Sequence, residues 1–230
     1  MMDGSAAKEP ASKESEPSFQ PEPAATAIDL AGAARTLKEL GLFDENFYAT
    51  SYPDVIAVGA DPFEHFFLYG YKEGRKPNPI FDPIWYVTTY PDVQEADAHP
   101  LLHYASVGEP DGRRPSPYFQ PAWYREKYGI PESESPLAHY LKNRLGPYSP
   151  ISEFDAQFYL QTYTDVALAG IDPFEHFIFH GYKEGRNPSA EFDTKFYIQR
   201  YFKGKTDQNP LLHYLEHRHE DGIYPSPPEN

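Results

Sequence analysis

Residues 43–80 read FDENFYATSYPDVIAVGADPFEHFFLYGYKEGRKPNPI, and residues 154–191 read FDAQFYLQTYTDVALAGIDPFEHFIFHGYKEGRNPSAE. The second stretch repeats the first at an offset of 111 residues. Weaker copies begin at Phe81, Phe119 and Phe192, so the five starts are separated by 38, 38, 35 and 38 residues. Self-similarity at such a period is the signature of a repeat protein. The sequence therefore predicts five tandem units, which span residues 43–80, 81–118, 119–153, 154–191 and 192–227.

The first helix of each unit is expected to follow a capping residue. In the first unit, Asp44 stands where an N-cap belongs, and Phe47, Tyr48 and Tyr52 fall at i, i+1 and i+5. This broad stripe is typical of a helix and differs from the alternation of a strand. Because the residue before a proline disfavours the α region, Pro53 is expected to end the helix.

The second helix of the first unit carries its own start and stop signals. Asp61, Pro62 and Glu64 are placed as N-cap, N1 proline and N3 acid, and Gly70 stands at the position of a C′ glycine. Each unit therefore reads as two short helices separated by a turn. Helices of about eight to ten residues are marginal alone and gain stability from neighbours. The sequence predicts an all-α fold, in which the units stack side by side as an α-solenoid.

Aromatic residues make up 16% of the chain, and many of them recur in two columns of the repeat. We expect both columns to form the core, because large side chains let short helices bury enough area to hold together. The first column is Phe47, Trp85, Trp123, Phe158 and Phe196, and the second is Tyr48, Tyr86, Tyr124, Tyr159 and Tyr197.

Two segments precede the repeats. Residues 1–27 are rich in Pro, Ser, Glu, Lys and Ala, a composition typical of disorder. Residues 28–42 contain an amphipathic stretch between Asp29, a candidate N-cap, and Gly41, which follows its end. Because a solenoid needs its terminal apolar face covered, we expect this segment to be an N-terminal capping helix.

Composition limits the classes of partner. The formal charge is −15 and the pI is near 4.9, so nucleic-acid phosphates and anionic lipid surfaces would repel the chain. The sequence has no cysteine, no N-terminal secretory pattern and no apolar run as long as a spanning helix. We therefore expect a cytoplasmic protein, with no nucleic-acid partner and no membrane insertion.

One histidine recurs at the same position in every unit, ahead of an aromatic residue. A shared metal ion is disfavoured, because packed helices lie about 8–10 Å apart whereas zinc ligands lie about 2 Å from one ion. We expect each imidazole to be structural and to bond a neighbouring carbonyl or loop; the alternative is a metal ligand or a general base. The five residues are His65, His103, His139, His176 and His213.

A Y-[PT]-D-V string after the first helix and a Gly-Arg string after the second occur together in the first, second and fourth units. The third and fifth units lack both strings. This joint gain and loss predicts that the Asp and the Arg touch, and that a bidentate pair ties the turn between the helices to the loop leaving the unit. The predicted pairs are Asp54 with Arg75, Asp92 with Arg113, and Asp165 with Arg186.

Two tyrosines are candidate ligand contacts. Tyr71 and Tyr182 follow the second helix, at a position where the second unit has Glu109. A position that accepts Glu is expected to be exposed, and exposed tyrosines can stack on sugar rings or anchor a partner. The alternative is that each tyrosine leans over the adjacent loop.

Signatures of catalysis are missing from the sequence. It contains no G-x-S-x-G, H-E-x-x-H or P-loop string, and no pair of acids marked for acid/base chemistry. His213 and His217 stand at i and i+4, with His219 and Glu220 behind them, a spacing that a metal site can use. Because His213 already belongs to the repeat, we expect no metal there, and no catalytic residue or cofactor in the chain.

The pattern FDxxxYxxxYPDV…DPxxHFxxxGxxEGR resembles the helical repeat modules of bacterial glycosyltransferases, including chains with a WbsX-like domain, and of other surface-polysaccharide proteins. Similar modules occur in some large secreted RTX-type proteins. The resemblance covers residues 43–227, and the third and fifth units depart from it at YPDV and EGR. Such modules accompany a catalytic or calcium-binding domain, and this chain has the signature of neither.

The sequence leaves three functions open. We expect a protein–protein scaffold, and the resemblance implies a glycosyltransferase or an export component of surface-polysaccharide synthesis as its partner. The first alternative is a carbohydrate-binding module that holds a polysaccharide through exposed aromatic side chains. The second alternative is an accessory N-terminal region of a glycosyltransferase.

Overall fold

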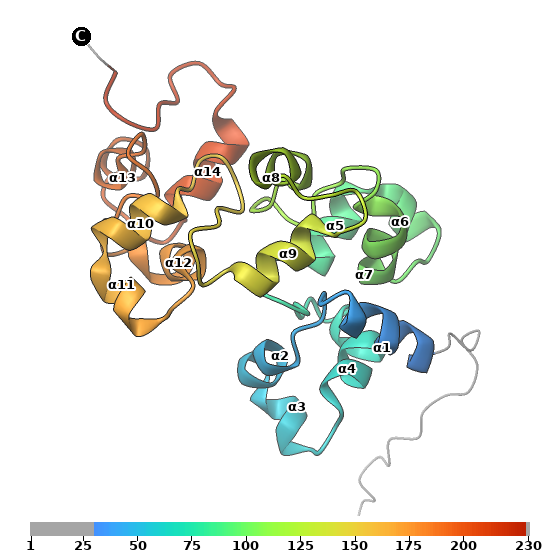
Figure 1. The fold of residues 1–230 in the computed structure, drawn as a ribbon. Coiled ribbons are helices and arrows are strands. Elements are labelled where there is room, and N and C mark those ends of the chain that lie inside the picture. Colours follow the sequence, from blue (N-terminus) through green and yellow to red (C-terminus); the bar gives the residue numbers. More distant parts are fainter. Residues whose placement is uncertain (1–29, 229–230) are drawn as a thin grey trace, which may run out of the picture.

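Helices are the regular secondary structure of residues 30–228, the part of the chain that the computed structural model describes. Fourteen α-helices and three π-helical turns form in these residues, and no strand does (Figure 1). The predicted all-α class is therefore confirmed. The disorder expected for residues 1–27 and the N-cap expected at Asp29 lie outside the described residues.

The helices follow the order of the sequence units (Figure 1). α1 is Leu30–Glu39 and precedes the first unit. The first unit contains α2 (Glu45–Ser51), α3 (Pro53–Ala57), α4 (Pro62–His65) and the π-turn η1 (Phe66–Gly70). The second contains α5 (Pro83–Thr89), α6 (Pro91–Glu95), α7 (Pro100–His103) and η2 (Tyr104–Gly108), and the third contains α8 (Pro121–Tyr128) and α9 (Pro136–Asn143). The fourth contains α10 (Ala156–Thr162), α11 (Thr164–Ala169), α12 (Pro173–His176) and η3 (Phe177–Gly181), and the fifth contains α13 (Thr194–Phe202) and α14 (Pro210–His217).

Three of the units contain one helix more than the sequence predicts. The predicted cap is present, since Asp44 Oδ1 accepts the Phe47 amide at 2.9 Å, and α2 ends before Pro53. However, Pro53 is also the first residue of α3, and Pro91 likewise begins α6. A proline suits this position, because its φ is fixed in the helical range and the first residue of a helix needs no amide donor. The expectation of two helices per unit is therefore wrong for the first, second and fourth units.

The last α-helix of these same units (α4, α7 and α12) continues into a π-turn, which holds one more residue than an α-turn. Gly70 lies inside η1 without a positive φ, so the predicted C′ glycine is wrong. Glycine is needed here because a Cβ would overlap the Tyr48 hydroxyl oxygen and lie 3.3 Å from Tyr48 Cζ. The second helices of the third and fifth units have neither a π-turn nor a glycine. The other two glycines and their tyrosines are Gly108 with Tyr86 and Gly181 with Tyr159.

Each sequence unit closes on itself through one backbone hydrogen bond, which we call the backbone clasp. In the first unit, the amide of the capping residue Asp44 donates to the carbonyl of Pro77 at 2.9 Å. The two ends of a unit therefore lie side by side. The same bond joins Asp82 to Pro115, Gln120 to Pro150, Asp155 to Pro188 and Asp193 to Pro225, at 2.9 to 3.1 Å.

The two aromatic columns differ in burial. All five tyrosines of the second column are fully buried, and they form the centre of each unit with the phenylalanine that begins it. The first column, from Phe47 to Phe196, is only partly buried. The prediction that both columns form the core therefore holds fully for the tyrosines alone.

One set of contacts between units lies at the end of α9, in the middle of the molecule (Figure 1). Arg144, directly after α9, pairs with Asp44 of the first unit at 3.2 Å and with Asp172 of the fourth at 3.4 Å. At the N-terminal side, α1 packs on the first unit, because Leu37 is fully buried and Lys38 Nζ lies 5.7 Å from the centre of the Phe63 ring. The third unit thus joins units that are distant in the sequence.

Candidate functional site

The repeated histidines bond the repeated tyrosines. In the first unit the hydroxyl of Tyr48, on α2, lies 3.0 Å from Nδ1 of His65, on α4. The partner is a side chain of the other helix, and not the carbonyl or loop that we expected. The remaining four pairs are Tyr86–His103, Tyr124–His139, Tyr159–His176 and Tyr197–His213, at 2.7 to 3.0 Å.

The electrostatics of these pairs suit a structural role. Burial raises the pKa of each of the five tyrosine hydroxyls, so each stays protonated and can donate to Nδ1. Burial also lowers the pKa of His176 and His213, which favours the neutral imidazole that accepts this bond. A phenol held in this way is a poor nucleophile, and the pair links the first helix of a unit to its last.

The Asp and Arg side chains that vary together in the sequence are in contact. In the fourth unit, Arg186 and Asp165 form two parallel hydrogen bonds of 2.9 and 2.7 Å. The guanidinium also lies 4.9 Å from the centre of the Tyr163 ring, and the Tyr163 hydroxyl accepts the amide of Asn187 at 2.7 Å. The closest contacts of the other two pairs are 2.8 Å, between Asp54 and Arg75 and between Asp92 and Arg113.

The third and fifth units keep the tyrosine of this arrangement without the ion pair. Tyr128 and Tyr201 accept the amides of Ser149 and Tyr224, each at 2.8 Å. The tyrosine therefore ties the exit loop to the first helix in all five units, and the Asp–Arg pair adds a second tie in three of them.

The two candidate ligand-contact tyrosines do not form an open surface. Tyr182 is buried, with 6% of its surface exposed, and belongs to the core. Tyr71 is half-buried, and its ring centre lies 4.4 Å from that of His99, the N-cap of α7 in the next unit. The expectation of exposure, drawn from Glu109 at the equivalent position, is wrong, because Glu109 is itself engaged. Its carboxylate accepts the Tyr104 hydroxyl and the amide of Leu137, at 2.9 and 3.1 Å.

The histidines near the C-terminus form no metal centre in the described residues. The His213 and His217 rings lie 4.3 Å apart, and His217 Nδ1 lies 2.7 Å from Glu220. Between residues 30 and 228, no group of three His, Asp or Glu side chains is placed to hold an ion. Across the same residues, no helix has both the length and the apolar character needed to cross a bilayer.

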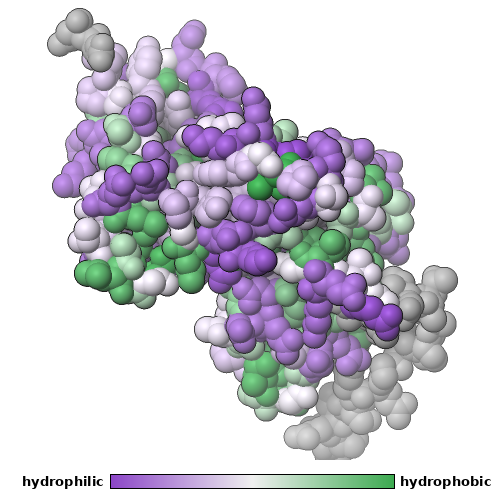
Figure 2. All heavy atoms as spheres, viewed as in Figure 1, coloured by the Kyte–Doolittle hydropathy of each residue, from purple (hydrophilic) through white to green (hydrophobic). Residues whose placement is uncertain are grey.

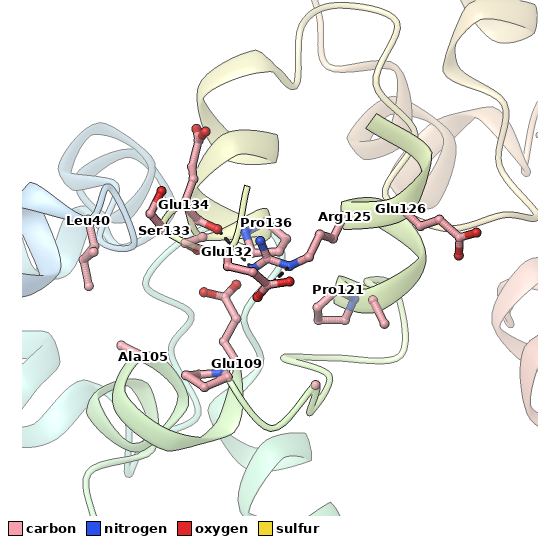
Figure 3. A pocket seen from close by; sticks show the side chains of 14 residues that line it. Leu40, Ala105, Glu109, Pro121, Arg125, Glu126, Glu132, Ser133, Glu134 and Pro136 are labelled. Carbon is pink, nitrogen blue, oxygen red and sulfur yellow. Dashed lines mark hydrogen bonds and ion pairs between the residues drawn. The ribbon is translucent and has the colours of Figure 1, made fainter. Parts of the chain in front are cut away.

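Two adjoining grooves of about 550 Å³ each separate α1 from the third unit. Both are lined by Leu40 and by the loop of residues 133–135. Figure 3 shows Arg125 reaching from α8 toward this loop, with Glu109 pointing into the groove from the opposite side. Arg125 is occupied there, because it donates to the Glu134 carbonyl at 3.1 Å. Acidic side chains outnumber basic ones in the lining of both grooves.

A third groove, of about 330 Å³, lies where the third unit meets the fourth. Its base holds Asp172, of which 4% is exposed, and Arg144, which pairs with it. Its walls include Leu145, Ile171 and Phe179, of which 59%, 43% and 52% are exposed. Leu168, on α11, is 88% exposed and lies three residues before Ile171 in the sequence. Figure 2 shows an apolar region over α11 and the turn to α12. We call Leu145, Leu168, Ile171 and Phe179 the fourth-unit patch.

Comparison with protein-family models, with curated proteins and with solved structures finds no match for this chain.

Proposed function

We propose that the chain is a non-catalytic scaffold that binds another protein, and that its five sequence units stack as an α-solenoid capped by residues 28–42. The five backbone clasps and the five Tyr–His bonds support the equivalence of the units. The burial of Leu37 against the first unit supports the capping role.

The fourth-unit patch is the observation that carries the scaffold function. The repeated tyrosines bond the repeated histidines, and the Asp and Arg side chains bond each other, so these groups have partners within their own unit. The patch, in contrast, exposes three large apolar side chains in the wall of a groove and a fourth, Leu168, on the preceding helix. Contiguous apolar surface of this kind marks interaction sites in soluble proteins.

The class of partner follows from the resemblance of the repeats. We infer that the partner is a glycosyltransferase or an export component of bacterial surface-polysaccharide synthesis, and that the complex forms in the cytoplasm. A chain of this kind can act as a separate subunit or as the accessory N-terminal region of such an enzyme. Its net charge of −15 argues against a nucleic acid as the partner.

The carbohydrate-binding alternative loses the residues on which it rested. Tyr182 is in the core and Tyr71 packs on His99, so neither presents an open ring face to a sugar. A glycan site would have to use other side chains.

Affinity purification of the tagged full chain from its native cells tests the scaffold function. We expect one protein of polysaccharide synthesis to co-purify in constant ratio and to bind the purified chain directly in calorimetry. The parallel titration with purified exopolysaccharide should give no heat at millimolar sugar. Recovery of polysaccharide without a protein partner would contradict the proposal.

A further inference from the structure

The fourth-unit patch is absent from the unit that otherwise matches the fourth unit most closely. At the offset of 111 residues, Leu168 replaces Ala57, Ile171 replaces Ala60 and Phe179 replaces Leu68. The first unit makes the same clasp, the same Tyr–His bond and the same Asp–Arg pair with the smaller residues. The larger apolar side chains of the fourth unit are therefore not needed to build it.

The second unit supports the same conclusion. At the corresponding positions, 38 residues after those of the first unit, it has Glu95, Ala98 and Ser106. The position of Leu168 thus accepts an acid, and that of Phe179 accepts a serine. Only in the fourth unit do all three positions carry large apolar residues, and there Leu145 of the third unit adds a fourth.

Charge around the patch selects among apolar partners. Glu175 lines the groove and has no ion pair in the described part of the chain, whereas Arg144, the one guanidinium lining the groove, is held between Asp44 and Asp172. The surroundings of the patch therefore favour a partner that brings its own positive charge.

We propose that the fourth-unit patch docks a basic amphipathic helix of the partner protein, with apolar side chains at i, i+3 and i+7 in the groove and lysines or arginines toward Glu175. This inference rests on the proposed scaffold function and identifies the surface and the chemistry of the contact. A second copy of the chain fits less well, because it would bring a net charge of −15 to a chain that carries the same net charge. Residues 1–29 fit poorly as well, because they contain two lysines against six acidic residues.

The chain supplies matched variants for the test. The patch variant, Leu168→Ala/Ile171→Ala/Phe179→Leu, carries the residues of the first unit. The control variant, Ile56→Ala/Val58→Ala, removes two exposed apolar side chains of the first unit and carries the fourth-unit residues at those positions, Ala167 and Ala169. Each substitution is thus already accommodated by a copy of the same fold.

The probe is a fluorescein-labelled leucine–lysine peptide whose leucines share one helical face, compared by anisotropy with a scrambled peptide of the same composition. We expect the wild type and the control variant to bind the amphipathic peptide equally, and the patch variant to bind it at least about tenfold more weakly. All three proteins should bind the scrambled peptide weakly and alike, because that binding depends on charge alone.

Other outcomes would overturn the inference. Equal binding by the patch variant and the wild type would show that the peptide recognises only charge. Sedimentation in which the wild type dimerises and the patch variant does not would identify a second copy as the occupant. If deletion of residues 1–29 raises the peptide affinity of the wild type and not that of the patch variant, that segment would be the occupant of the patch. If a native partner co-purifies equally with the patch variant, this inference fails and the scaffold function stands; if no partner is found, the scaffold function itself fails.

Discussion

Replacing Gly181 with Ala tests whether the π-turn exists to admit a tyrosine hydroxyl. Gly181 has no positive φ, so its conformation alone would accept alanine. Helix propensity would then favour the substitution by about 1 kcal/mol. The structure predicts the opposite sign, because a Cβ at this position would overlap the Tyr159 hydroxyl oxygen.

The size of the effect follows from what surrounds the new methyl group. It would lie 3.3 Å from both Tyr159 Cζ and His176 Nδ1, and the Tyr159 ring is fully buried and has no room to withdraw. Overpacking of this kind costs about 1–3 kcal/mol. Displacement of the hydroxyl also breaks its 2.9 Å bond to His176, which costs about 0.5–1.5 kcal/mol more. We expect Gly181→Ala to destabilise the chain by roughly 2–4 kcal/mol.

Urea unfolding followed by circular dichroism measures this loss, and Tyr159→Phe separates its cause. Alone, Tyr159→Phe should cost about 1 kcal/mol, because His176 loses its partner. Combined with Gly181→Ala, it removes the atom that clashes, so the double variant should be more stable than Gly181→Ala alone. Gly170→Ala is the control: its φ of +63° makes it strained, but no atom lies within 4 Å of its Cβ position, so Tyr159→Phe should not rescue it. A Gly181→Ala protein as stable as the wild type, or an additive double variant, would refute the steric explanation.

Three further predictions concern charge and burial. Asp165→Asn should destabilise the chain at neutral pH and leave its stability unchanged in strong acid. The reason is that the hydrogen bonds from Arg186 lower the pKa of Asp165 below its ordinary 3.8. The contribution of Asp165 to stability is therefore present above pH 3.8 and is lost as the pH falls through the lower pKa of the folded state. Unfolding of both proteins between pH 7 and pH 2 measures this, and a constant difference would contradict it. The contribution of Asp172 to stability depends on pH in the opposite direction, because burial raises its pKa to about 7. This contribution is present below pH 3.8 and is lost as the pH rises through 7. Arg144→Ala leaves the Asp172 carboxylate without a cation and should cost about 3 kcal/mol of stability at pH 8. The loss should be smaller at pH 5, where Asp172 is protonated. Equal losses at the two pH values would argue against an ion pair between Arg144 and Asp172. Tyr182→Ala should cost about 3 kcal/mol or more in thermal unfolding, whereas an exposed ligand-contact tyrosine would change stability by less than about 0.5 kcal/mol.

Local signals predicted the helices of this chain well. Asp44 and Asp61 cap where the sequence places them, because a carboxylate bonding an amide three residues ahead requires nothing from the rest of the molecule. The sequence predicted that Pro53 ends a helix, but not that it also begins the next one. Gly70 misled the prediction, because its role depends on Tyr48, which lies 22 residues earlier in the sequence.

The candidate site was less predictable, and for a physical reason. The Asp–Arg contacts could be predicted from the sequence, because both residues vary together among the units. The Tyr–His bonds could not be predicted in this way, because both residues are present in all five units and positions that do not vary do not reveal their partners. The burial of Tyr182 and the junction of Arg144 with Asp44 arise from packing between units, which a period found along the chain does not describe.

The backbone clasp has a mechanical consequence. Its two residues are separated by 30 to 33 positions in the sequence, and in every unit the residue before the clasp proline adds a second bond, from its amide to a tyrosine hydroxyl. A pulling force on the two ends of the chain would act across the clasp and the tyrosine bond of each unit. Opening one clasp would release roughly 100–120 Å of extended chain. Under load, we therefore expect the chain to lengthen in steps of about this size, one sequence unit at a time.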